Sequence, residues 1–329
     1  MSKSVEVLID NVERVIQGKR AAIENVVVAL LADGHVLLED VPGVGKTILA
    51  RALARSLDAD CQRIQCTPDL LPADVTGVSV FHPAERRFEY RRGPIFTNVL
   101  LVDEINRATP RTQSAFLEAM EERQVTAEGQ SLPLTEPFFL IATQNPIELA
   151  GTFPLPEAQL DRFLMRLSLG YPSDAAELDM MATQRQRHPL ADLAPVLTTD
   201  DVLRARAVVR QTFVHPSVMA YIQAIVRATR EHEHLAYGAS PRGALALMRT
   251  AQARAALRGA RFVDPDDVKQ LAAVVLGHRL VPEPGARVHG IDGPTVVGQV
   301  LGKVAVPVEV EPDDDELADP AAAAGAAAS

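Results

Sequence analysis

The residues with the clearest chemical potential lie in one short stretch, LLEDVPGVGKT, at positions 37–47. The stretch nearly matches G-x-x-x-x-G-K-[ST], a loop that binds phosphate, but Asp40 stands where the first glycine belongs. Gly43 and Gly45 remain, and they matter most because tight turns must aim backbone N–H groups at the anion. We expect Asp40, at the exit of the preceding strand, to face the backbone as in an Asx-turn. The loop then still binds a nucleotide.

The residues after these glycines supply the charge and the hydroxyl that a triphosphate requires. Lys46 provides a positive charge for the β- and γ-phosphates. Thr47 offers a hydroxyl to Mg²⁺ at the start of a predicted helix, whose N-terminus favours anions. The residues that we expect to surround the nucleotide here are Pro42, Gly43, Val44, Gly45, Lys46, Thr47 and Ile48.

A second group of polar residues follows two buried apolar runs. LLVDE ends in Asp103 and Glu104, and a pair of carboxylates at the end of a buried strand is costly unless it is paired or functional. Asp103 is placed to hold Mg²⁺ through its water shell, and Glu104 to polarise the water that attacks the γ-phosphate. IATQNP places Asn145 at the end of a further strand, where its amide can orient that water.

Two arginines are candidates for neutralising charge in the transition state. Arg162, in EAQLDRFLMR, belongs to the first predicted domain and by topology points toward a neighbouring subunit's site. Arg242, in GASPRGALAL, begins a helix of the second domain and could reach the phosphates only if that domain folds over the loop. For each arginine alone, a surface salt bridge is the alternative interpretation.

The elements that must position these residues alternate between strand and helix. HVLLE (35–39), NVLLVDE (98–104) and FFLIATQNP (138–146) are short apolar runs of the buried-strand type. Residues 46–58 and 111–123 have helical periodicity. Alternation of this kind predicts a three-layer α/β domain with a parallel sheet, in which the carboxyl ends of the strands share the ligand side.

The character of the chain changes after about residue 185. Four helical segments follow, each beginning at or just after Asp, Pro or Ser, and they predict a small all-helical domain. The last segment is acidic and alanine-rich, without the apolar residues that would offset the entropy of ordering. We therefore expect a nucleotide-binding domain at 1–185, a helical domain at 190–305 and a disordered tail at 306–329.

Composition narrows the class of partner. The net charge is −10, and seven carboxylates of the final acidic segment carry most of it. A mildly acidic body without a basic stripe argues against a nucleic-acid partner. No stretch reaches the length and apolarity of a membrane span, and two cysteines cannot build a disulfide framework. We expect a protein of the cytoplasm that does not insert into membranes.

The order of the motifs, VPGVGKT, LLVDE, ATQNP, LDRF and SPR, resembles that of the AAA+ ATPases, and specifically the MoxR family. The resemblance covers about residues 10 to 280. It implies ATP and Mg²⁺ as ligands, Lys46 and Thr47 as the Walker A pair and Asp103 and Glu104 as the Walker B pair. It further implies that Asn145 is sensor 1, Arg162 the arginine finger and Arg242 sensor 2. Gln17 and Gly18 resemble the segment whose backbone contacts adenine.

The resemblance also implies two structural additions and a biological role. Residues 70–96 are similar to the helix-2 insert, and residues 124–134 to the β-hairpin before sensor 1. Members of the family assemble as rings, generally hexamers, and remodel protein clients, frequently with a partner that carries a von Willebrand A (VWA) domain. Maturation of metalloenzymes, including cofactor or metal insertion, is the recurring theme.

Two other function classes stay open at this point. A phosphotransferase acting on a small molecule would need an acceptor pocket and lid arginines, which a single SPR in a helical domain fits poorly. An AAA+ nucleic-acid motor shares the helix-2 insert, but the acidic charge balance and the lack of a basic, aromatic groove weigh against it.

Overall fold

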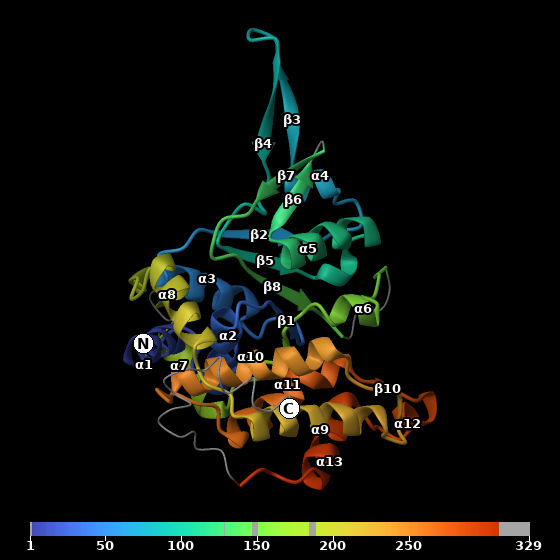
Figure 1. Cartoon of the computed structure of the whole chain (residues 1–329). Coiled ribbons are helices and arrows are strands. Elements are labelled where there is room, and N and C mark those ends of the chain that lie inside the picture. Colours follow the sequence, from blue (N-terminus) through green and yellow to red (C-terminus); the bar gives the residue numbers. More distant parts are fainter. Residues whose placement is uncertain (1, 128, 147–150, 184–188, 309–329) are drawn as a thin grey trace.

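A sheet of five parallel strands forms the centre of the computed structural model, which describes residues 2–127, 129–146, 151–183 and 189–308 (Figure 1). The strand order is β2–β5–β8–β1–β9. The strands are β1 (Val36–Glu39), β2 (Cys61–Gln65), β5 (Val99–Asp103), β8 (Phe139–Gln144) and β9 (Met165–Leu167). Because all five run in the same direction, their carboxyl ends form one edge of the sheet and their amino ends the opposite edge.

Helices cover both faces of the sheet. Alternate residues of β1 take part in different apolar clusters, because successive side chains of a strand point to opposite faces. Val36 and Leu38 pack in the cluster of α1, α2 and α3, whereas Leu37 packs in the cluster of α5. These helices are α1 (Ser2–Glu13), α2 (Arg20–Leu31), α3 (Lys46–Ser56) and α5 (Pro110–Glu122). The predicted three-layer α/β class is confirmed.

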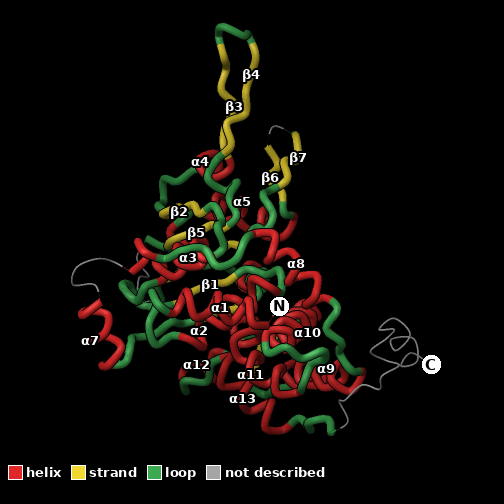
Figure 2. Tube along the Cα trace, turned by 90° about the vertical axis from the view of Figure 1, so that its left-hand side faces the viewer, coloured by secondary structure: helices red, strands yellow, loops and turns green. Residues whose placement is uncertain are grey.

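Two hairpins project from the same end of the molecule (Figures 1 and 2). The longer one follows α4 (Pro72–Thr76) and pairs β3 (Gly77–His82) with β4 (Arg87–Arg92), and the shorter pairs β6 (Gln124–Ala127) with β7 (Gln130–Pro133). Gly93 allows the base of the longer hairpin to close, because a Cβ there would lie 2.3 Å from the carbonyl oxygen of Val75. Of the turn expected at Glu128-Gly129, Glu128 lies outside the described residues.

The C-terminal half contains a helical domain. Its helices are α8 (Thr199–Arg210), α9 (Pro216–Arg230), α10 (Pro241–Leu257), α11 (Pro265–Leu276), α12 (Pro284–Val288) and α13 (Gly293–Lys303), with a 3₁₀ turn η3 (Gly277–Arg279). Side-chain caps explain two of the starts: Thr198 accepts from the amide of Asp201, and Asp264 from that of Asp266. One feature that the sequence did not predict is a small antiparallel pair, β10 (Leu235–Tyr237) with β11 (Val281–Pro282).

Four short elements complete the described structure. Two lie within the sheet domain, η1 (Ile105–Arg107) and α6 (Glu157–Leu160), and two lie between β9 and α8, namely α7 (Asp174–Thr183) and η2 (Pro189–Asp192). The acidic tail predicted to be disordered lies, from residue 309 onward, outside the described residues. In the part of the chain that the structure describes, no helix has the length and apolarity needed to cross a membrane.

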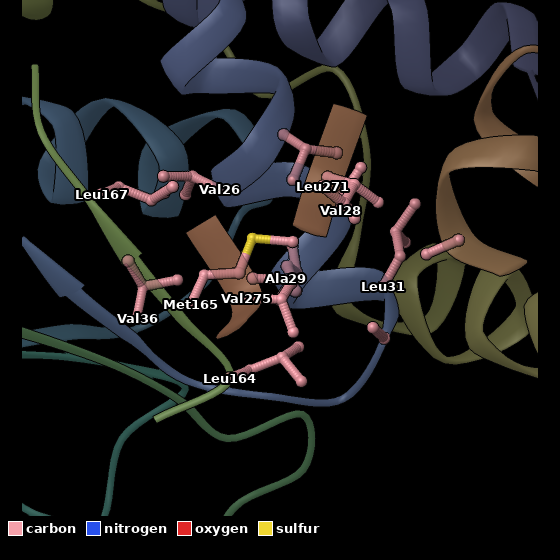
Figure 3. Close-up of a cluster of buried hydrophobic side chains, with 14 of the residues drawn as sticks. Val26, Val28, Ala29, Leu31, Val36, Leu164, Met165, Leu167, Leu271 and Val275 are labelled. Atoms are coloured by element: carbon pink, nitrogen blue, oxygen red, sulfur yellow. The ribbon is translucent and has the colours of Figure 1, made fainter. Parts of the chain in front are cut away.

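The helical domain docks beside the sheet through a shared apolar core. Figure 3 shows Val28 and Ala29 of α2, Met165 of β9, and Leu271 and Val275 of α11 in one cluster, and all of these side chains are buried. Because α11 packs against the β9 side of the sheet, the helical domain lies alongside this edge strand. Figure 1 shows it at the opposite end of the molecule from the β3–β4 hairpin.

Candidate functional site

The phosphate loop joins the carboxyl end of β1 to the N-terminus of α3. Gly43 and Gly45 have φ angles of +87° and +96°, a left-handed backbone that favours glycine. Gly45 is the N-cap of α3, so the first amides of the helix point into the loop. Lys46 donates from Nζ to the carbonyl oxygen of Asp40 at 2.6 Å. Burial lowers the pKa of Lys46, and the nearby carboxylates of Asp40, Asp103 and Glu104 oppose that effect.

Asp40 explains how the loop tolerates its departure from the glycine pattern. Its side chain is buried and faces the backbone, as expected, but the Asx-turn interpretation is wrong about its partners. Oδ2 accepts from the amides of Leu169 and Gly170 and from the hydroxyl of Ser168, all just beyond the end of β9. The carboxylate therefore ties the loop to a neighbouring segment and is directed away from the position of the phosphates.

Asp103, at the end of β5, faces the hydroxyl of Thr47. Thr47 Oγ1 lies 3.3 Å from Asp103 Oδ2, and Thr143 Oγ1 on β8 donates to Oδ1 at 3.1 Å. Sequence reasoning did not single out Thr143, although its place two residues before Asn145, near the end of a buried strand, was a usable signal. The hydroxyl and carboxylate oxygens are the hard ligands that Mg²⁺ prefers. No cluster of three or more His, Cys, Asp or Glu residues suited to a metal occurs among the described residues.

Glu104 has a backbone conformation that is uncommon for a residue with a side chain, with φ +56°. Its amide donates to Thr143 Oγ1 at 2.9 Å. Gln65 Nε2 and Arg107 Nη1 both donate to its Oε2 at 3.0 Å. Arg107 and Gln65, the latter from the end of β2, therefore hold this carboxylate from two sides.

Arg63 is a further neighbour that sequence reasoning missed. Its Nε donates to Asp103 Oδ2 at 2.6 Å, and its Nη2 donates to Gln65 Oε1 at 2.8 Å. β2 therefore contacts both carboxylates, Asp103 through Arg63 and Glu104 through Gln65. The alternation in CQRIQC was a usable signal, because residues two apart on a strand share a face.

Asn145 follows β8, which lies between β1 and β5 in the sheet. Its side chain is buried. The topology therefore places it at the carboxyl edge, between the strand that leads into the phosphate loop and the strand that ends in Asp103. This is the position expected for a residue beside the γ-phosphate.

A cavity of about 420 Å³ lies against the phosphate loop. Its lining is largely apolar and combines three segments, listed here by residue: Val15, Ile16, Gln17, Lys19, Pro42, Gly43, Val44, Gly45, Ile48, Tyr171, Pro172, Ala176, Glu177 and Met180. Gln17 Oε1 is buried and has no hydrogen-bond partner among the described residues. Gly18 has φ +70° and lies close to Ala176. Tyr171 and the α7 residues were not predicted to take part.

Arg162 and Arg242 lie together at the amino edge of the sheet. Both contact Glu121 of α5, Arg162 Nη1 at 2.7 Å and Arg242 Nη2 at 2.6 Å. A cavity of about 400 Å³ beside them is lined by Gly34 and His35, which precede β1. The phosphate loop follows the other end of β1. The condition under which Arg242 could reach the phosphates of its own chain, a helical domain folded over the loop, is not met.

Comparison with known proteins agrees with this geometry. Residues 35–165 match the family described as "ATPase family associated with various cellular activities (AAA)", and residues 227–297 match an AAA lid domain. The fold and the site define the class: an AAA+ ATPase, which binds and hydrolyses ATP.

Proteins of similar sequence and structure identify the family within this class. The chain is 50% identical to uncharacterized protein YeaC of Bacillus subtilis (92% of this chain, 94% of that protein). It is 40% identical to Chaperone MoxR1 of Mycobacterium tuberculosis (99% of this chain, 89% of that protein). A crystal structure of a protein from Cytophaga hutchinsonii is similar with a TM-score of 0.86 at 36% identity, over 93% of this chain and 96% of that one. The chain belongs to the MoxR family of AAA+ ATPases.

Proposed function

We propose that this chain is a ring-forming ATPase that shares its active sites between neighbouring subunits and uses hydrolysis to remodel a protein client. The separation of the site into two halves is the observation that carries the proposal. The phosphate loop and the carboxylates of Asp103 and Glu104 lie at the carboxyl edge of the sheet, whereas Arg162 and Arg242 lie at the amino edge. A neighbour that presents its arginines to this loop completes the site.

Within one subunit, the proposed roles follow from position. The amides from Gly43 to Thr47 and the ammonium group of Lys46 bind the phosphates. Thr47 directly and Asp103 through water would hold Mg²⁺, which when bound neutralises charge on the β- and γ-phosphates. Glu104 polarises the attacking water and Asn145 orients it. Gln65 and Arg107 both donate to Oε2 of Glu104, so we assign its Oε1 to the water.

The cavity beside the loop suits the nucleobase. Its apolar walls can contact the faces of a purine, and its volume of about 420 Å³ is adequate for a base and sugar. The buried Oε1 of Gln17, which has no partner among the described residues, can accept from the exocyclic amine of adenine. We therefore assign ATP as the nucleotide, with Gln17 and Gly18 at the adenine.

The proposed assembly and partners rest on the family and on the shape of the molecule. We infer a homo-oligomeric ring, hexameric as in the family, in the cytoplasm. The nucleotide-binding domain (1–185) and the helical domain (190–305) would then alternate around it. The similarity to a chaperone and the two projecting hairpins support a protein client. A VWA-domain partner and a role in cofactor or metal insertion are part of this proposal.

Mixing subunits tests the shared site. Arg162→Ala and Glu104→Gln subunits should each have little turnover alone. Mixed together they should regain turnover, because some interfaces then combine an intact loop and Glu104 from one subunit with an intact Arg162 from its neighbour. Wild-type protein with either variant serves as the control, and a mixture of the two variants that stays as inactive as the separate proteins would contradict a shared site.

The small-molecule phosphotransferase reading is less well supported. Such an enzyme needs arginines over its own phosphate site, and none of the residues lining the described cavity beside the loop is an arginine. The helical domain, which would supply them as a lid, packs beside β9 instead.

A further inference from the structure

Glu121, in the last turn of α5, joins two arginines that come from different parts of the chain. Its Oε2 lies 2.7 Å from Nη1 of Arg162, which follows α6, and its Oε1 lies 2.6 Å from Nη2 of Arg242, in α10. We propose that Glu121 is a positioning residue: it holds Arg162 and Arg242 as one unit that a neighbouring subunit's γ-phosphate contacts. This inference rests on the shared site proposed above.

The electrostatics of the surrounding cavity explain why a carboxylate is needed. Five arginines and three carboxylates line it: Arg123, Arg162, Arg242, Arg249 and Arg279 with Asp33, Glu121 and Asp161. Two guanidinium groups that must converge on one anion repel each other until the anion arrives. A single carboxylate that accepts from both keeps them adjacent in its absence. Each guanidinium has five N–H donors and uses few of them on Glu121, so donors remain for a phosphate oxygen.

The start of α10 is anchored to the sheet domain beside the same carboxylate. Ser240 Oγ donates to Asp161 Oδ2 at 3.2 Å, and Arg279 Nε donates to Asp161 Oδ1 at 2.8 Å. Arg279 is almost completely buried and also donates to the carbonyl oxygen of Phe163. Asp161 and Arg279 thus fix where α10 begins, and Glu121 fixes where the Arg242 side chain points.

The exposed fractions of these three side chains indicate that Glu121 positions the arginines and does not stabilise the fold. The side chains of Glu121, Arg162 and Arg242 are 34%, 35% and 47% exposed. Ion pairs that are this accessible contribute little to the free energy of unfolding. Loss of the Glu121 charge should therefore change the geometry of the arginines while leaving the fold and the chain's own nucleotide site intact.

The first test compares Glu121→Gln and Glu121→Ala with the control Glu122→Gln, the next residue on α5, whose side chain is exposed. We expect both Glu121 variants to keep the wild-type unfolding temperature and ATP affinity, and to lose turnover by roughly tenfold to a hundredfold, as expected for misplaced catalytic groups. The control should match wild type. Wild-type turnover in Glu121→Ala, or weakened ATP binding in Glu121→Gln, would overturn the inference.

The second test assigns the half of the site to which Glu121 belongs. Glu121→Ala mixed with Glu104→Gln should regain turnover above the sum of the separate proteins, since some interfaces then combine two intact halves. Glu121→Ala mixed with Arg162→Ala should regain none, because both defects lie at the amino edge. The opposite pattern would place Glu121 with its own loop and overturn its proposed role. If Arg162→Ala with Glu104→Gln also fails to recover, the shared site itself is wrong.

Discussion

At the scale of single residues, the carboxylate of Asp103 is held from three sides. Thr47, Arg63 and Thr143 all contact it, and the guanidinium of Arg63 is the only positively charged group that the described structure places within ion-pair distance. A cation at this carboxylate would compete with the Mg²⁺ that we propose there. Arg63 is about half exposed, so its side chain is free to leave the carboxylate if the metal binds.

Arg63→Gln should lower the Mg²⁺ concentration needed for half-maximal ATP turnover. An ion pair that is half exposed contributes about 1 kcal/mol or less, and its removal makes the carboxylate of Asp103 more available to the metal by that free energy. We therefore expect the half-maximal Mg²⁺ concentration to fall roughly two- to fivefold. A Mg²⁺ titration of turnover measures it, with Gln62→Ala, one residue away on the same strand, as the control. A higher Mg²⁺ requirement would instead show that Arg63 holds Asp103 in its working position.

His35 is a buried histidine whose protonation should make the stability of the fold depend on pH. Burial lowers the pKa of His35 well below its ordinary value, and the charge of Arg123 adds to the effect. Nδ1 accepts from the amide of Leu140 at 3.0 Å, so a proton on Nδ1 would also break this hydrogen bond. The folded chain keeps the ring neutral, whereas the unfolded chain takes up a proton below about pH 6.5.

The free energy of unfolding should therefore fall as the pH drops below about 6.5, because the unfolded state then binds more protons than the folded state. A buried neutral histidine such as His35 can lower the free energy of unfolding by at most about 1.4 kcal/mol for each pH unit of acidification. His35→Asn keeps an acceptor for Leu140 and cannot titrate, so its stability should depend less steeply on pH between 7.5 and 5.5. Equal slopes in denaturant titrations of the two proteins would contradict this role.

At the scale of elements, the contact between α13 and η3 determines how the helical domain meets the sheet. η3 contains Arg279, which anchors Asp161 beside the paired arginines. At the start of α13, Gly293 approaches the backbone of Gly277 so closely that a Cβ would lie 1.9 Å from the Gly277 carbonyl oxygen. The close approach of these two elements therefore requires glycine at position 293.

Gly293→Ala should destabilise the protein by about 1–3 kcal/mol, because the added methyl group forces the two elements apart. Gly298, on the same helix, is exposed and has no atom within 4 Å of a built Cβ. Gly298→Ala should therefore stabilise the helix by about 0.5–1 kcal/mol. Denaturant unfolding of both variants checks the opposite signs, and a neutral Gly293→Ala would show that α13 can shift without cost.

At the scale of the whole molecule, the polarity of the sheet separates the two groups of charged residues. Parallel strands place all their carboxyl ends at one edge, where Asp103 and Glu104 meet the loop. The helical domain, packed beside β9, adds Arg242 to Arg162 at the other edge. One chain folded in this way keeps the two groups of charged residues at opposite edges of the sheet.

Turnover per subunit should consequently rise with protein concentration and then reach a plateau, with Mg²⁺ and ATP in excess, because in the proposed shared site each loop needs a second subunit. Light scattering at the same dilutions gives the mass of the particle. Constant turnover from a particle with the mass of one chain would mean that the site is self-contained, and the phosphotransferase reading would then be the better one.

Much of the nucleotide site was readable from the sequence because its signals are local. Gly43, Gly45, Lys46 and Thr47 follow one another from a strand into a helix, and LLVDE ends a run whose apolarity alone indicates a buried strand. The three-layer fold followed from the alternation of such runs with helical segments. These patterns depend on neighbours within a few residues, so local periodicity and backbone geometry are enough to recognise them.

The tertiary structure alone decided which distant residues meet. Asp40 binds amides 129 and 130 residues away, and Glu121 holds Arg242 across 121 residues of chain. The docking of the helical domain beside β9 placed Arg242 with Arg162 rather than over the loop. Such contacts depend on strand order and on the packing of α10 against α2 and of α11 against β9, which arise from apolar burial summed over the whole chain. No local pattern encodes them. The sequence therefore determined which chemical groups each cluster contains, while the fold decided that the two clusters lie at opposite edges of the sheet.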